Sequence, residues 1–291
     1  MTEASRYLIA IAADVAAAYV DTTGPRAVLL TGSAAEGVSD YHSDLDLIAY
    51  YDRLPIEDQL EAARDSLQAI DVRVSPGREA LLEEYALRGI ECQVAHITIF
   101  SWERNMASVL EECTPATNAQ KAINGLLDGH SLHGDDLIQG WKDRAAAYPD
   151  GLAMATVEHY LQFFPLWLAA ERWDARDATI FYHQMLVDSS LNLLGVLAGL
   201  NRLYFSTFQF KRLDRFVSEM HSKPARLAVH LNSLFALDPV DAGAELERLV
   251  DETLTLVETH MPIVNTKPSR RHVGKRHDPW TRTARPPSTE L

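Results

Sequence analysis

LLTGSAAEGVSDYHSDLDLIAYY, residues 29–51, is the stretch that says most about this chain. An apolar segment runs into Gly32 and Ser33, and Asp44 and Asp46 then open a second apolar segment. Gly32 has no Cβ atom, so a phosphate group can approach its backbone closely. Ser33 adds a hydroxyl and an N–H group at the start of a turn or helix. The pattern predicts two buried strands joined through a phosphate-binding turn.

The two aspartates, Asp44 and Asp46, are two residues apart on a predicted strand. Their side chains therefore leave the same face of the sheet. Two adjacent carboxylates repel each other unless a cation lies between them, and in proteins that cation is usually a metal ion. The alternative is a Gly-Ser loop followed by two surface aspartates at the end of a strand.

The first hundred residues alternate helix and strand signals around this stretch. Apolar residues at helical spacing predict helices, and β-branched runs bounded by Gly and Pro predict strands. These signals indicate a small sheet with helices packed against it. We expect helices over 4–20 and 55–70, and strands over 26–31, 45–51, 71–75 and 90–100.

The strand signal disappears after Ser101, and helical stripes follow one another to Pro262. Strands followed by a run of helices are typical of an α+β domain joined to an all-α helical bundle. We expect helices from Ser101 and over 117–128, 135–147, 152–171, 178–199, 207–220, 224–237 and 240–260. The predicted domains are 1–105 (α+β), 106–264 (helical) and 265–291 (a basic tail).

Composition limits the classes of function. The 291 residues hold 27 Lys and Arg against 41 Asp and Glu, a formal net charge of −14, so an extended nucleic-acid groove is not expected. Two cysteines are too few for a disulfide scaffold, which favours a reducing cytoplasm. The most apolar stretch, 193–200, is far shorter than the roughly 20 residues that cross a bilayer.

The tail differs in charge from the rest of the chain. Residues 265–291 hold seven Lys and Arg against Asp278 and Glu290. A flexible, solvated extension is the favoured interpretation. The alternative is a basic arm that folds back on the acidic body.

The Gly-Ser pair followed by Asp-x-Asp resembles the nucleotidyltransferase superfamily that includes DNA polymerase beta. That resemblance implies a third carboxylate on a neighbouring strand, for which Glu91 in LRGIECQVAHI is the candidate. This segment looks like the equivalent strand of aminoglycoside nucleotidyltransferases of the streptomycin/spectinomycin type. Strand alternation places Glu91 and Gln93 on one face. Either they point into the cleft with Asp44 and Asp46, or they face water.

The helical half resembles the same branch in one place. Residues 191–216 are similar to the helix–loop–helix where these enzymes place a lysine on the nucleotide phosphates, and Lys211 is the matching candidate. On a continuous helix over 207–220, Lys211 and Arg215 lie one turn apart, opposite the apolar stripe. The alternative is a solvated cationic face.

The resemblance implies transfer of a nucleoside monophosphate, from ATP or another NTP, to a hydroxyl with release of pyrophosphate. Asp44, Asp46 and Glu91 would bind two Mg²⁺ ions, and Gly32, Ser33 and Lys211 would hold the phosphates. The expected acceptor is a small molecule such as an aminoglycoside-like antibiotic or a natural product, and an acidic cleft would suit a cationic one. Two alternatives stay open: a protein adenylyltransferase acting on a partner such as a toxin, and a non-catalytic nucleotide-binding relative.

His130 and His133 in GHSLHG are a further possible metal-binding pair. Their loop setting and the absence of partner cysteines favour a turn and a helix cap instead.

Overall fold

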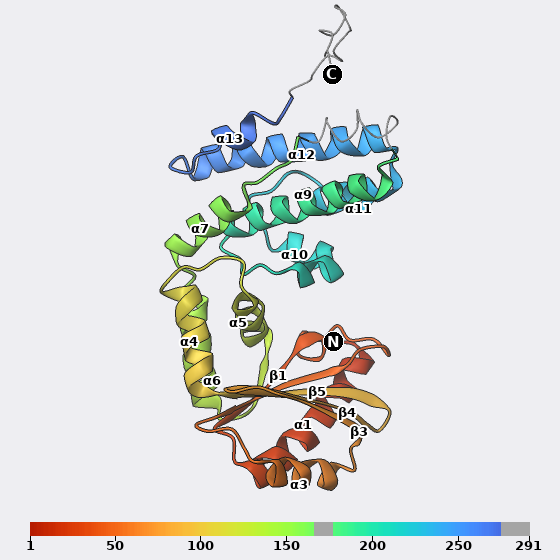
Figure 1. Ribbon diagram of the computed structural model, residues 1–291, viewed down its shortest axis with the longest axis vertical. Helices are drawn as coiled ribbons and strands as arrows, with labels where there is room; N and C mark the ends of the chain where they lie inside the picture. The colour runs from red at the N-terminus through yellow and green to blue at the C-terminus, as the bar shows by residue number, and fades with distance from the viewer. Residues whose placement is uncertain (166–176, 275–291) are drawn as a thin grey trace, which may run out of the picture. The chain divides into compact units, whose positions relative to one another are not determined.

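The computed structural model describes residues 1–165 and 177–274, which form two compact units (Figure 1). The first unit comprises Met1–Thr156 together with Arg202–Lys211, and the second comprises the described residues of 157–201 and 212–274. This division differs from the boundary expected at residue 105. Helices that the sequence assigned to a separate helical domain instead belong to the sheet-bearing unit.

The first unit is built on a six-stranded sheet in the order β3-β4-β5-β2-β1-β6. β2 and β5 are parallel, and every other neighbouring pair is antiparallel. The strands are β1 (Ala27–Thr31), β2 (Leu45–Tyr51), β3 (Ile70–Pro76), β4 (Ala80–Leu87), β5 (Ile90–Thr98) and β6 (His130–His133).

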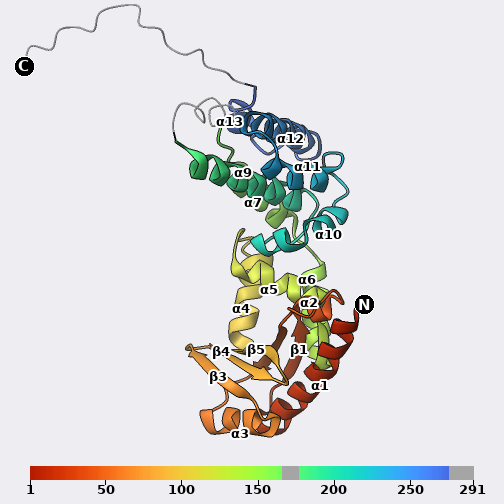
Figure 2. The ribbon, with the colours of Figure 1, turned by 90° about the vertical axis from the view of Figure 1, so that its right-hand side faces the viewer.

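Helices cover both faces of this sheet (Figure 2). α1 (Glu3–Thr23) and α3 (Glu57–Leu67) share one apolar core with it. α4 (Ile99–Leu110), α5 (Asn118–Asp128) and α6 (Asp135–Ala146) share a second core on the other face. The short α2 (Gly32–Ala35) follows β1 directly. The sheet with helices was therefore predicted correctly, but its helical cover is larger than expected.

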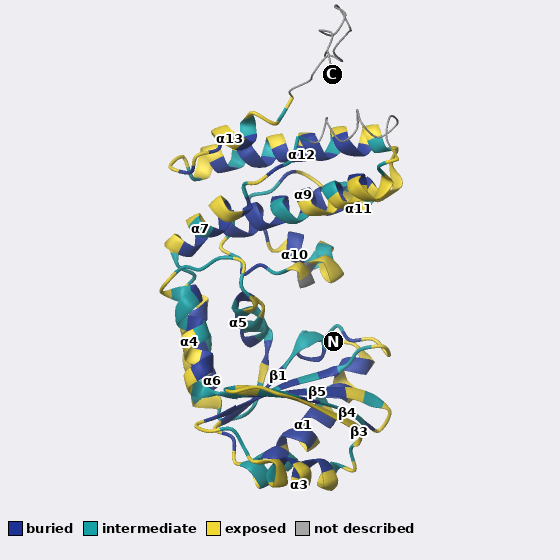
Figure 3. Cartoon of the chain, viewed as in Figure 1, coloured by how far each residue is buried: buried dark blue, intermediate teal, exposed yellow. Residues whose placement is uncertain are grey.

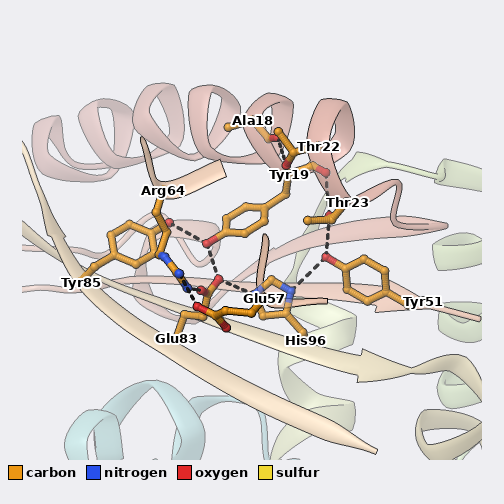
Figure 4. Close-up of polar contacts among 10 residues, drawn as sticks. All are labelled: Ala18, Tyr19, Thr22, Thr23, Tyr51, Glu57, Arg64, Glu83, Tyr85 and His96. Atoms are coloured by element: carbon orange, nitrogen blue, oxygen red, sulfur yellow. Dashed lines mark hydrogen bonds and ion pairs between the residues drawn. The ribbon is translucent and has the colours of Figure 1, made fainter. Parts of the chain in front are cut away.

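A buried polar network joins α1 and α3 to the sheet (Figure 4). The Glu83 carboxylate on β4 accepts hydrogen bonds from Tyr19 (2.6 Å) and Arg64 (2.5 Å), and His96 Nε2 lies 2.9 Å from it. His96 Nδ1 in turn lies 2.9 Å from the hydroxyl of Tyr51. Although burial acts to raise the pKa of Glu83, the hydrogen bonds from His96 and Tyr19 outweigh it, and the pKa lies below its usual value.

Two strands differ from the sequence-based expectation. β4 was not predicted, because the fully buried Glu83 interrupts the apolar alternation on its inner face. β6 was expected to be a turn, with His130 and His133 beside a helix cap. It pairs instead with β1 at the edge of the sheet, and Gly134 is the N-cap residue of α6. A four-residue strand is too short to leave a periodic signal.

The second unit is helical, as expected. α9 (Thr179–Leu200) packs against α12 (Pro239–His260), whose buried and exposed residues alternate along its length (Figure 3). α7 (Asp150–Tyr160) spans the division between the units, and the Tyr160 ring leaves no room for a Cβ at Gly195 on α9. The helix predicted over 152–171 ends at Tyr160, and its last part falls outside the described residues.

Shorter helices complete this part of the chain. They are η1 (Thr207–Arg212), α10 (Leu213–Ser218), α11 (Leu227–Ser233), η2 (Leu234–Ala236) and α13 (Lys267–Arg270). Across residues 1–165 and 177–274, no helix combines the length and the apolar character needed to cross a bilayer.

The start of the basic tail is folded. Arg270 on α13 forms ion pairs with Asp251 and Glu258 on α12, and Ser269 donates a hydrogen bond to the Leu161 carbonyl at 2.7 Å. Residues 265–274 therefore match the alternative expectation of a basic arm folded onto an acidic surface. The rest of the tail lies outside the described residues.

Candidate functional site

The register of the sheet places Gly32 beside Asp46. β1 and β2 are antiparallel, and Thr31, the last residue of β1, pairs with Asp46. The chain turns from Thr31 into Gly32 at the edge where β2 begins. The two parts of the sequence motif, separated by ten residues, therefore meet at one point, as the sequence predicts.

Only glycine fits at position 32. Its φ angle is +68°, in the left-handed region that residues with a Cβ rarely adopt. A Cβ placed there would lie 2.3 Å from Oδ2 of Asp46. The backbone of the turn and the carboxylate of Asp46 are thus packed against each other.

The two aspartates influence each other. Burial and, to a smaller extent, the neighbouring Asp44 carboxylate raise the pKa of Asp46 to about 6, although the positive charges of Lys121 and Lys211 act to lower it. Asp44 and Asp46 are therefore close enough to repel, as the strand spacing predicts. Without a ligand, the two lysines offset this repulsion only in part.

Ser33 lies in α2, and the loop that follows α2 is tied to the start of α1. The Ser33 hydroxyl is 2.9 Å from the hydroxyl of Ser39. The backbone of buried Ser39 donates a hydrogen bond to Ser5 Oγ (2.9 Å), and its carbonyl accepts one from Thr2 Oγ1 (2.8 Å). These contacts fix the loop between the Gly-Ser pair and the aspartates. The phosphate role predicted for Ser33 stays a prediction.

Glu91 lies on the expected face of β5 but is engaged elsewhere. The parallel register pairs Asp46 with Gln93, so the residue before Cys92 is level with Asp44. The Glu91 side chain is 59% exposed and lies 3.3 Å from Arg73. Within the described residues, no group of three or more His, Cys, Asp or Glu could hold a metal ion. The metal-binding or proton-accepting role of Glu91 stays a prediction.

Lys211 reaches the site by a different route from the one expected. The helix predicted over 207–220 is broken: Lys211 lies in the 3-10 helix η1, whereas Arg215 lies in α10 and pairs with Glu219. The two cations therefore do not share one helical face. Lys211 belongs to the sheet-bearing unit and acts on Asp46 by its charge.

Two hydrogen bonds hold the segment that carries Lys211 in the first unit. Tyr204 donates to the Ala145 carbonyl on α6 (2.7 Å), and the Phe205 N–H donates to Gln120 Oε1 on α5 (3.0 Å). Each bond joins residues that are far apart in the sequence: Tyr204 and Ala145 are separated by 59 positions, and Phe205 and Gln120 by 85. No local pattern could have shown this return of the chain.

Sequence reasoning missed one cation altogether. Lys121 on α5 is exposed, and its charge acts on Asp46 together with that of Lys211. On the sequence it stands alone in an amphipathic helix, where an exposed lysine is ordinary. Only the packing of α5 against the end of β1 gives it significance.

The donor groups of this site fit a hard divalent cation. Asp44 and Asp46 supply carboxylate oxygens, the ligands that Mg²⁺ prefers, and a bound cation would relieve the repulsion between the two carboxylates. The remaining Mg²⁺ ligands in such sites are commonly water and substrate phosphate oxygens. Two protein carboxylates are therefore enough to begin such a site.

No family model matches this chain, and no curated protein sequence matches it. Among solved structures, it is similar to a nucleotidyltransferase-like protein from Exiguobacterium sibiricum at 10% identity. The similarity covers 91% of this chain and 79% of that one, with a TM-score of 0.35. That value is too low to assign a fold or an activity, so the assignment of the site depends on its own residues.

Proposed function

We propose that this chain is a Mg²⁺-dependent nucleotidyltransferase that transfers a nucleoside monophosphate from an NTP, with ATP the first candidate, to a hydroxyl of a small acceptor. The observation that carries the proposal is the contact between Gly32 and Asp46, with Asp44 adjacent. This arrangement places a glycine turn, whose backbone carries no Cβ, against a pair of carboxylates that repel each other. A structural turn has no need for such a repulsive pair.

Each residue has a separable task in this proposal. Asp44 and Asp46 would hold the divalent ions, which when bound would neutralise charge at the α-phosphate and lower the pKa of the attacking hydroxyl. Gly32 and Ser33 position the phosphate chain, and Lys211 offsets its negative charge. Glu91, once released from Arg73, is the candidate to receive the hydroxyl proton or complete the metal site.

The bond changes balance without another reactant. The acceptor oxygen forms a bond to the α-phosphorus, the bond from that phosphorus to the bridging oxygen breaks, and pyrophosphate leaves with the bonding electrons. The hydroxyl proton passes to Glu91 or to water. The acidic composition supports a cationic, aminoglycoside-like acceptor, a natural product is the other candidate, and the two cysteines favour a reducing cytoplasm.

The test is incubation with α-labelled ATP, Mg²⁺ and a panel of hydroxylated acceptors, cationic and neutral. We expect pyrophosphate release and label on a small molecule. Asp46→Asn should reduce release to below a few per cent of wild type while retaining the fold. Label on a protein band would instead indicate protein adenylylation. Wild-type release by Asp46→Asn, or no Mg²⁺-dependent binding of any NTP, would refute the proposal.

A further inference from the structure

α5 is fixed directly against the turn that contains Gly32. Thr31 Oγ1 donates a hydrogen bond to the Gly125 carbonyl at 3.2 Å. A Cβ at Gly125 would lie 2.6 Å from Thr31 Oγ1. α5 therefore approaches the end of β1 as closely as a helix backbone can. Lys121 is four residues before Gly125, so both lie on the same face of α5. The lysine is carried on the face that packs beside the Gly-Ser turn.

The backbone of Lys121 is held in place while its side chain is exposed. Ile123 and Leu126 of α5 are fully buried in the core shared with α4 and α6. The adjacent Gln120 is buried and accepts the Phe205 N–H. These contacts hold α5 beside the turn. The backbone of Lys121 is therefore fixed in position, and the charge of its side chain acts on Asp46.

A cation in this position is unfavourable for a site that binds only a metal ion, because it would repel the metal. It is favourable where an anion enters together with the metal. The phosphate chain of an NTP is such an anion, and lysine binds phosphate as a compact point charge. The charges of Lys121 on α5 and Lys211 on η1 both act on Asp46, so a phosphate chain that enters beside Asp46 would meet positive charge from two elements.

We propose that Lys121 is a second phosphate-binding residue of the nucleotide site, contacting the phosphate chain of the NTP from α5. This inference rests on the proposed function. Before nucleotide binds, Lys121 offsets part of the repulsion between Asp44 and Asp46. When the metal and nucleotide bind together, the metal neutralises the carboxylates and the lysine contacts phosphate oxygens.

The test is Lys121→Met, which keeps the length of the side chain and removes the charge. Calorimetric titration with Mg²⁺ and ATP, GTP, CTP or UTP identifies the NTP that wild type binds best. For that NTP we expect the Kd of the variant to rise about tenfold to a hundredfold. The Kd of the matching nucleoside monophosphate should change less than about twofold. Lys121→Arg should recover part of the affinity, since the charge returns in another shape.

Arg144→Ala is the matched control. Arg144 is an exposed cation on α6, which packs against α5, and it pairs with Glu111 at 3.4 Å. Its loss should leave both Kd values unchanged. Wild-type NTP affinity in Lys121→Met, or an equal loss for the monophosphate, would overturn the inference and leave the proposed function standing. Absence of Mg²⁺-dependent NTP binding by wild type itself would overturn both.

Discussion

At the scale of single residues, the site depends on Gly32 and Asp46 being in contact. Their identities could be read from the sequence, because the ordered pattern of Gly-Ser and Asp-x-Asp carries the resemblance. Their contact follows from one register, in which Thr31 pairs with Asp46. The engagement of Glu91 with Arg73 could not be predicted, since β3 joins the sheet through β4, a strand without an apolar alternation.

Asp46→Asn should stabilise the metal-free protein at neutral pH. Burial, then Asp44, raises the pKa of Asp46 from 3.8 to about 6, so the fold favours the protonated carboxyl. Stability is therefore lost as the pH rises through this window, and the ionised carboxylate is a cost above it. We expect the variant to gain on the order of 1–3 kcal/mol near pH 8. The gain should vanish near pH 4, as measured by urea unfolding in EDTA. A loss of stability at both pH values would contradict the repulsion.

Gly32→Ala should damage both stability and nucleotide binding. The new Cβ would require a strained φ angle and would displace the Asp46 carboxylate. We expect a loss of about 1–3 kcal/mol in unfolding free energy and loss of Mg²⁺-dependent NTP binding. Gly24→Ala is the matched control, because Gly24 also has a positive φ but nothing lies near its Cβ position. Gly24→Ala should lose stability but retain Mg²⁺-dependent NTP binding.

At the scale of elements, the sequence predicted most of what packs locally and missed what only the sheet explains. α5, α9 and α12 were predicted nearly to their ends, because long stripes with capping residues are strong local signals. β4 was missed because Glu83 occupies a core position. Its partners Arg64 and His96 come from other elements, so their compensation is invisible along the chain.

Glu83→Gln tests how much this network contributes to the fold. The substitution removes the carboxylate that pairs with Arg64 and His96 inside the protein. The Arg64 charge then loses this buried partner, which is costly. We expect a loss of about 3–5 kcal/mol in the free energy of unfolding in urea. Glu84→Gln, on the opposite face of the same strand and partly exposed, should cost less than about 1 kcal/mol. Equal losses of unfolding free energy in the two variants would show that β4 is sensitive to any substitution and that the buried network makes no special contribution.

At the scale of the whole molecule, chain connectivity decides which residues meet at the site. The chain leaves the first unit after Thr156 and returns for Arg202–Lys211. Lys211 therefore belongs to the unit that holds the carboxylates, although the sequence predicted it to lie in a separate helical domain, 106–264. The anchors of this return are two long-range hydrogen bonds, from Phe205 to Gln120 and from Tyr204 to Ala145.

Gln120→Leu should weaken nucleotide binding although Gln120 faces the core. The substitution leaves the buried Phe205 N–H without its acceptor, which costs about 1–3 kcal/mol and releases the segment that carries Lys211. If Lys211 acts on the nucleotide through this segment, Gln120→Leu should raise the Kd for Mg²⁺ and NTP severalfold in the wild-type background. It should add almost nothing to Lys211→Ala, a non-additivity that a double-mutant cycle measures.

The control for general destabilisation is Glu83→Gln, which weakens the same unit from the other face of the sheet. Well below its melting temperature, that variant should bind nucleotide like wild type, and its effect should add fully to that of Lys211→Ala. If the effects of Gln120→Leu and Lys211→Ala on the Kd added fully, the Gln120–Phe205 hydrogen bond would not act on the nucleotide through Lys211. The nucleotide would then be held by the carboxylates, the Gly-Ser turn and α5 alone. In that case the returning segment would serve only to stabilise α5 and α6, to which Phe205 and Tyr204 are hydrogen-bonded.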